Sequence, residues 1–295
     1  MKKLFEKLLG QNLSQPTPLK NNQVRTDLKV VPPGKKNEFL GTQQGYVAVI
    51  VFPEYPELAA ILNDEASAGF LRDYSNVIQK VLGKKLSLID MSKDGVATIA
   101  VADNPKQSPQ AVTEMFTELD KFMLIWVGTF GRMSIPPLKY KLGIGRGEMT
   151  ISESEPKIIG PAVDQALEIA QKVCVEFDVR VAASGDLIRA SSEAASWVDL
   201  DDWMFTGAGP KTAAKPVRVF SRLTDRLDPE DLQILRAGRK AYFHQNWEEA
   251  AQKFDRINRV PGIRGITEKY IKRIKSLKKR PKNPEWDGVY RKEGE

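Results

Sequence analysis

From residue 46 onwards, the apolar residues follow first the spacing of a β-strand and then the spacing of an α-helix. Residues 46–52 form an apolar run rich in β-branched side chains, which predicts a strand in the centre of a sheet. Residues 58–82 place apolar side chains along one side at helical spacing, which predicts a helix. The helical pattern returns over residues 109–128.

The stretch between these two helices predicts a β-hairpin. Residues 85–91 and 95–101 are both apolar runs of strand length. They are separated by a turn that contains Asp94 and Gly95, and an Asp-Gly pair between such runs is a strong hairpin signal.

The second half of the pattern completes the set of elements. It predicts a strand over 138–143, a turn at Gly160, a helix over 163–177 and a further strand from 179. The resulting order is β-α-β-β-α-β, which is typical of a ferredoxin-like α+β core. In that fold the end of the first strand and the hairpin turn lie next to each other.

The C-terminal third predicts a smaller helical unit. Residues 215–220 predict a late edge strand, and residues 229–253 predict a helical hairpin that resembles a single tetratricopeptide-like repeat. One such repeat cannot bury its own apolar face, so it must pack on the main domain or on a partner. The predicted segments are an amphipathic start and flexible arm (1–44), a main domain (45–195), a linker with the edge strand (196–227), the helical hairpin (228–280) and an extended tail (281–295).

Charge and composition indicate a water-soluble protein with a basic surface. The formal net charge is +7, and much of the surplus lies in residues 269–282, which predict a helix with a basic outer face. A solvated face is the simplest interpretation, and an anionic membrane surface is an alternative partner. Nucleic acid is disfavoured because no nucleic-acid-binding motif accompanies the basic residues.

The rare residue types exclude several classes of chemistry. The only cysteine, Cys174, has apolar neighbours and cannot form an intrachain disulfide, which favours a reducing compartment. The only histidine, His244, argues against a histidine-based triad or a site with several histidines. No apolar run is long enough to span a bilayer. We therefore expect a cytoplasmic location, or a peripheral one on the inner face of the membrane.

Four segments in the same order resemble motifs of the class III adenylate and guanylate cyclases. Residues 51–55, 93–96, 142–148 and 158–170 are similar to the family's Phe-Ala-Asp-Ile, Gly-Asp-Gly-Val, Gly-Ile-Gly-x-x-x-Gly-Glu and Ile-Gly-Asp-Ala-Val-Asn elements. The resemblance covers about residues 45–195 and implies a class III cyclase homology domain. It also implies a head-to-tail dimer that joins ATP or GTP into a cyclic nucleotide.

The resemblance assigns metal binding to two acidic residues. In the family, two Asp side chains hold two divalent ions, and the matching positions here are Glu54 and Asp94. Carboxylate oxygens are the ligands that hard cations prefer. The resemblance therefore implies Mg²⁺ or Mn²⁺ if any activity remains, although we expect no resident cofactor.

The remaining site positions depart from the family's pattern. The base-reading positions hold Asp90 and Pro161, and the positions of the family's catalytic Asn and Arg hold Asp164 and Glu168. Two carboxylates thus stand where the family neutralises the charge of a triphosphate. We expect a catalytically degenerate domain, a pseudoenzyme, that acts as a binding or assembly module in a larger complex.

An enzymatic alternative stays open. The chain could form half of a hetero-dimeric cyclase site by lending Glu54 and Asp94 to a partner that keeps the Asn and Arg. Both interpretations predict a homodimer or pairing with a related cyclase domain.

Overall fold

The computed structural model describes residues 41–62, 64–82, 88–92, 94–103, 108–132, 138–151, 157–191, 196–205, 216–223 and 227–290. Residues 1–40 of the predicted arm lie outside this part of the chain. The first strand starts at Gly41, so the last four residues of that predicted arm, 41–44, belong to the sheet.

The first half of the chain contains the predicted elements with small changes in their bounds. They are β1 (Gly41–Val51), α2 (Tyr55–Ile61), α3 (Asp64–Leu82), β2 (Leu88–Met91), β3 (Ala97–Ala102), α4 (Pro109–Arg132) and β4 (Lys141–Ile151). The single helix expected over 58–82 is two helices, α2 and α3. Leu62, which follows α2, has extended backbone angles that interrupt the helical path.

The second half contains more elements than the sequence predicts. They are β5 (Ile158–Ile159), α5 (Pro161–Glu168), the π-helical turn η3 (Ile169–Val173), α6 (Cys174–Glu176), β6 (Val181–Ser184), α7 (Gly185–Ala190), β7 (Trp197–Trp203), β8 (Val217–Arg222), α8 (Pro229–Phe243), α9 (Trp247–Ile257) and α10 (Arg264–Leu277). The predicted helical hairpin is thus a unit of three helices.

The strands form one sheet in the order β2-β3-β1-β4-β6-β8-β7. Neighbours within β2-β3-β1-β4 are antiparallel, which confirms the predicted ferredoxin-like α+β core. β6 joins β4 in parallel, and β8 and β7 extend the sheet beyond it. The late strand predicted at the edge is therefore wrong in its place, because β8 is internal and β7 forms that edge.

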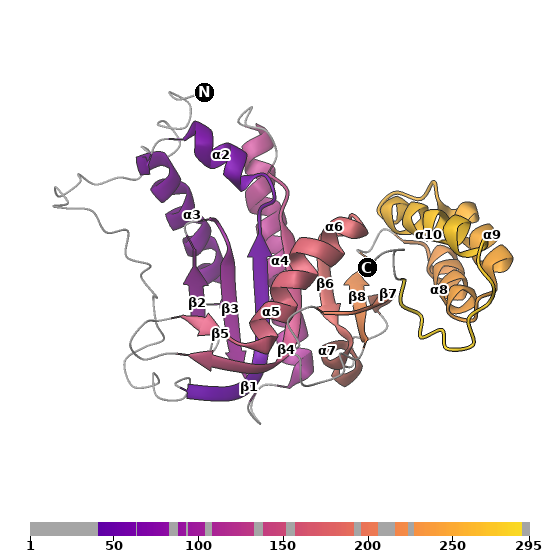
Figure 1. The fold of residues 1–295 in the computed structure, drawn as a ribbon. Helices are drawn as coiled ribbons and strands as arrows, with labels where there is room; N and C mark the ends of the chain where they lie inside the picture. The colour runs from indigo at the N-terminus through magenta and orange to yellow at the C-terminus, as the bar shows by residue number, and fades with distance from the viewer. Residues whose placement is uncertain are drawn as a thin grey trace, which may run out of the picture.

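Helices cover both faces of the sheet (Figure 1). Alternate residues of β1 point to opposite faces, as the strand period requires. Tyr46, Ala48 and Ile50 pack in the core beneath α3 and α4, while Val47 and Val49 pack with α5 on the other face. Burial on both faces explains why the strand is an unbroken apolar run.

Two glycines in β4 let α5 approach the sheet closely. A Cβ atom on Gly143 would lie 2.1 Å from the carbonyl oxygen of Ala166, and one on Gly145 would lie 2.8 Å from that of Ala162. Both residues lie inside β4, and only the absence of a side chain allows the helix to pack there.

The three C-terminal helices lie beside the β7–β8 edge of the sheet (Figure 1). Their aromatic side chains share a core with the strands; Tyr242 and Phe254 pack there with Leu200 and Val219. The start of the predicted linker, residues 197–203, is instead strand β7.

Buried ion pairs reinforce the same contact. Asp201, which is 2% exposed, accepts a hydrogen bond from Nη1 of Arg273 at 2.5 Å, and Asp202 accepts one from Nη2 of Arg239 at 2.8 Å. Arg273 also donates to Glu176. The basic helix over 269–282 is therefore not only a solvated face, because one of its arginines is buried in a salt bridge.

No helix in the described part of the chain combines the length and apolar character needed to cross a bilayer.

Candidate functional site

A sharp turn at Gly160 connects β5 to α5 and places the start of that helix at the sheet. Gly160 has a φ of 123°, a conformation that favours glycine. Its carbonyl accepts hydrogen bonds from the backbone N–H groups of Val163 and Asp164 at 2.9 and 3.1 Å. Pro161 occupies the first turn of the helix, where its missing N–H costs nothing.

A cavity of about 320 Å³ lies between this turn and the β2–β3 hairpin. We call it the Gly160 cavity. The hairpin side of its wall holds Asp90, Ser92, Val96 and Thr98, and the turn side holds Lys157, Ile158, Ile159, Gly160, Val163 and Asp164. Its volume lies near the lower end of the range for small-molecule sites, about 300–1,000 Å³.

Asp90 is the partly buried acid of this cavity. Burial raises its pKa above the ordinary value of 3.8, while a hydrogen bond from the backbone of Ile158 and the charge of Lys157 act in the opposite direction. The matching residue in the family reads the base, and its usual side chain is Lys or Glu. Here the position carries Asp, which is one methylene shorter than Glu, and its carboxylate turns toward the chain's own β5 segment.

The structure separates the four positions that the sequence assigns to nucleotide recognition and catalysis. Asp90 and Asp164 both line the Gly160 cavity. Pro161 is exposed at the start of α5 and is not among the lining residues. Glu168 lies two turns further along the helix, is buried, and accepts hydrogen bonds from Nζ of Lys172 at 3.0 Å and from Nε1 of Trp203 at 3.3 Å.

The two acids matched to the metal ligands lie at one end of paired strands. Ile50 in β1 pairs with Ala97 in β3, so the segment after β1 and the turn before β3 meet there. Asp94 is exposed. The pKa of Tyr55 is raised mainly by the burial of its own side chain and, second, by the negative charge of Asp94. Glu54, next to Tyr55, has a solvent-shielded Oε2 atom without a hydrogen-bond partner.

The donor set at this end is small for a divalent cation. Ca²⁺ takes about six to eight oxygen ligands, and Mg²⁺ requires an octahedral set that often includes one or two carboxylates, waters and substrate phosphates. Among the described residues, no group of three or more His, Cys, Asp or Glu side chains is placed to hold a metal ion.

Lys157, a basic residue of the Gly160 cavity, was not predicted from the sequence. It lies directly before β5, in a stretch of sequence that has no periodic pattern. Its proximity to Asp90 depends on the pairing of β5 with β4 at Ile158 and Ile151, which the sequence does not reveal.

No protein-family model matches the sequence, and a search of curated proteins gives no match. The comparison with solved structures finds adenylyl and guanylyl cyclase domains. The adenylyl cyclase CyaB from P. aeruginosa is 20% identical with a TM-score of 0.47, over 61% of this chain and 95% of that chain. The adenylate/guanylate cyclase/hydrolase from Silicibacter pomeroyi is 16% identical with a TM-score of 0.45, over the same shares.

A third solved structure is the guanylate cyclase domain of RhGC from Catenaria anguillulae in complex with GTP. It is 11% identical with a TM-score of 0.42, over 60% of this chain and 94% of that chain. These neighbours are class III cyclases, the family that the sequence motifs resemble.

Proposed function

We propose that this chain is a cyclase-like domain that has lost nucleotide cyclisation and serves as a binding and assembly module. The observation that carries the proposal is the charge of the Gly160 cavity. Asp90 and Asp164 line it, and Lys157 is its one basic residue among those described. A nucleotide placed there would meet one carboxylate at a base-reading position, Asp90, and a second at Asp164, which takes the place of the family's neutral Asn.

The energetic consequence is large on the scale of catalysis. Two unit charges about 4 Å apart interact by about 4 kcal/mol at an effective dielectric constant of about 20. An acid in place of a catalytic cation, as at Glu168, therefore replaces an attraction with a repulsion of similar size. Because about 1.4 kcal/mol changes a rate tenfold, loss of the attraction alone costs roughly a thousandfold.

Glu168 supports the same proposal from the other end of α5. Its carboxylate accepts hydrogen bonds from Lys172 and from Trp203, so it joins the helix to strand β7. A residue held in this way supports the packing of the sheet. It also has the same sign of charge as a phosphate, so it cannot do what the family's Arg does at this position.

The partner in the assembly role would be a second copy of this chain or a related domain. The family resemblance points to pairing through the face that carries the Gly160 cavity. Light scattering over a range of concentrations tests this part: a two-fold assembly is expected, and a monomer at high micromolar concentration argues against it.

Turnover tests the catalytic part. Purified full-length chain is incubated with ATP or GTP and with Mg²⁺ or Mn²⁺, and cyclic AMP and cyclic GMP are quantified. We expect no more product than in buffer. Product that disappears in an Asp94→Ala variant would overturn the proposal.

One observation favours a second function, in which the chain lends metal ligands to an intact cyclase partner. The Oε2 atom of Glu54 is shielded from solvent and lacks a hydrogen-bond partner, and a cation could satisfy it. Mixing the chain with such a cyclase should then raise product formation above that of the cyclase alone, and Glu54→Gln should remove the gain. The absence of any gain removes this function.

A further inference from the structure

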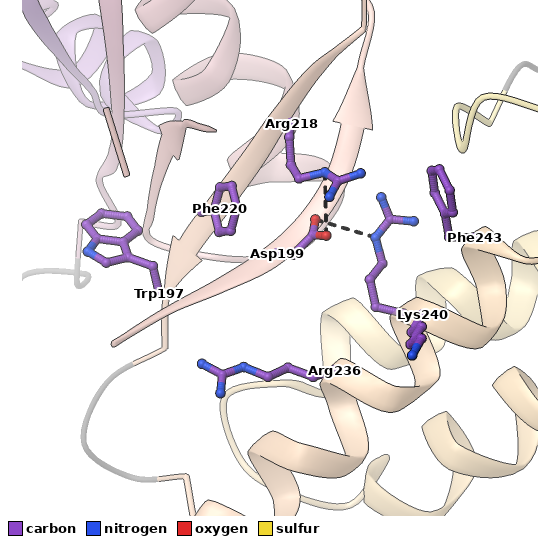
Figure 2. A pocket seen from close by; sticks show the side chains of 8 residues that line it. Trp197, Asp199, Arg218, Phe220, Arg236, Lys240 and Phe243 are labelled. Carbon is purple, nitrogen blue, oxygen red and sulfur yellow. Dashed lines mark ion pairs between the residues drawn. The ribbon is translucent and has the colours of Figure 1, made fainter. Parts of the chain in front are cut away.

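A second cavity of about 400 Å³ lies where the sheet edge meets the C-terminal helices (Figure 2). We call it the arginine cavity. β7 and β8 provide Trp197, Asp199, Arg218 and Phe220, and α8 provides Arg236, Arg239, Lys240 and Phe243. It shares no lining residue with the Gly160 cavity, so the inference drawn from it does not depend on the proposed function.

The spacing along α8 explains how its residues reach one cavity. Arg236 precedes Arg239 and Lys240 by three and four positions, and Phe243 follows them by four and three, which places them on neighbouring parts of one helix face. Figure 2 shows that Phe243 extends from α8 on the side where Arg218 lies. Strand period places Arg218 and Phe220 on the same face of β8.

Basic residues outnumber acidic residues among the side chains that line the cavity. Asp199 is the acid among the described lining residues, and the nearby Asp202 accepts hydrogen bonds from Arg218 at 3.0 Å and from Arg239 at 2.8 Å. Asp201, which is 3.5 Å from Nη2 of Arg239, adds a third acid beside these two arginines. Arg236 and Lys240 then add positive charge at the exposed side of the cavity.

Arg239 gives the cavity an unfilled binding position. Its side chain is 5% exposed, and its Nε and Nη1 atoms are shielded from solvent without a hydrogen-bond partner. The ion pair between Nε and Asp199 is 3.5 Å long. A buried guanidinium donor without an acceptor is costly, and an oxygen of a bound anion would satisfy it.

Aromatic rings form the other part of the wall. Trp197 is almost fully buried, Phe220 is half-buried, and Phe243 is 36% exposed. The Arg218 guanidinium lies 5.7 Å from the centroid of the Phe243 ring, so the ring helps to hold the charged group in place. A ligand that only carried charge would leave these apolar surfaces in contact with water.

We infer that the arginine cavity binds a small organic anion whose carboxylate or phosphate meets the arginines and whose planar apolar body lies against the aromatic rings. Arginine suits both acid groups because its planar fork of donors can bind two oxygens at once. The volume is that of a small-molecule site, which falls within about 300–1,000 Å³.

Isothermal titration calorimetry on the full chain tests this inference with four probes. These are 1-naphthoate, 1-naphthyl phosphate, inorganic phosphate and the uncharged 1-naphthol. We expect one saturable site for at least one naphthyl anion. Inorganic phosphate and 1-naphthol should each bind at least tenfold more weakly than that anion, because each lacks one of the two recognised parts. The two naphthyl anions distinguish carboxylate from phosphate ligands.

Matched variants locate the site. Arg236→Glu with Lys240→Glu changes two exposed residues of the cavity, and Lys272→Glu with Lys275→Glu makes the same charge change on exposed positions of α10. The first pair should weaken binding at least tenfold, and the second should leave it unchanged. Far-UV circular dichroism checks the fold, and the milder pair Arg236→Gln with Lys240→Gln replaces the first if its spectrum changes.

Three results would overturn the inference. The first is the absence of saturable binding by either naphthyl anion. The second is equal weakening in the cavity pair and the α10 pair, which shows general charge attraction. The third is binding of 1-naphthol as tight as that of the anions, which shows an apolar contact alone.

Discussion

Removal of the Asp201 carboxylate should destabilise the junction between the sheet and the C-terminal helices. The side chain is 2% exposed, bonds Arg273 at 2.5 Å, and lies 3.5 Å from Nη2 of Arg239. It also accepts a hydrogen bond from the Tyr270 hydroxyl at 3.3 Å. Asp201→Ala therefore leaves two buried arginines with one acid fewer.

The expected loss of stability depends on the acidic partners that these two arginines retain. Loss of one partner from a buried ion pair costs about 3–5 kcal/mol. Arg273 keeps Glu176 at 3.1 Å and Arg239 keeps Asp202 at 2.8 Å, so we expect the lower end of that range. A loss of about 3 kcal/mol is a large part of the 5–15 kcal/mol by which domains are usually stable.

Urea unfolding at pH 7, followed by far-UV circular dichroism, measures this loss. Asp186→Ala is the matched control, because Asp186 pairs with Arg189 at 2.7 Å but both side chains are more than half exposed. Such a pair contributes less than about 1 kcal/mol. Replacing both partners, as Asp201→Leu with Arg273→Met, should recover most of the loss. Equal losses in Asp201→Ala and Asp186→Ala would refute the reasoning.

Three further predictions concern stability and reactivity. Burial alone would raise the pKa of Glu176, but hydrogen bonds from Lys269 and Arg273 outweigh it and hold the pKa below its ordinary value of 4.5. The stability that this carboxylate contributes is therefore present above pH 4.5 and is lost as pH falls through the lower folded value. Urea unfolding at several pH values should show that Glu176→Gln has a lower free energy of unfolding than the wild type already at pH 7. This free energy should then fall less steeply in acid, and a fall as steep as that of the wild type contradicts the prediction. Burial raises the pKa of the Cys174 thiol to about 12. A thiol reagent at pH 8 should therefore label Cys174 only at the rate at which the protein unfolds. Immediate labelling of the native protein contradicts the buried position of this residue. Deletion of residues 228–290 should abolish cooperative unfolding, because α8–α10 share their core with β7 and β8. If the remaining chain still melts cooperatively, the helices are instead a surface on which a partner protein docks.

Much of the fold could be predicted from the sequence because burial imposes a period on it. The run at residues 46–52 is apolar throughout because both faces of β1 are covered. β4 was predicted too short for a related reason. Gly143, Gly145 and Gly147 interrupt its apolar pattern, and the close approach of α5 that requires the first two is a tertiary contact.

Buried charged residues could not be predicted from the sequence in this way. Asp199, Asp201 and Asp202 do not resemble a buried strand, yet β7 contains all three. Their partners Arg239 and Arg273 lie far along the chain in helices, and only the folded structure brings them together. The arginine cavity was missed for the same reason, although the basic spacing along α8 was visible.

The candidate site was predicted in part. Asp90 and Asp164 were matched to nucleotide-handling positions, and the structure places them in one cavity. Glu168 was matched to a catalytic position, but its hydrogen bond from Trp203 depends on β7, which the sequence did not predict as a strand.

Nucleotide binding by the Gly160 cavity tests the central claim most directly. The measurement is calorimetric titration of the full chain, and of an Asp90→Lys, Asp164→Asn variant, with a non-hydrolysable ATP or GTP analogue in Mg²⁺. The variant restores side chains of the types that the cyclase family carries at these positions. The account predicts no saturable binding by the wild type and a gain of at least tenfold in affinity by the variant. Wild-type binding as tight as that of the variant would contradict the claim that these two acids exclude the nucleotide.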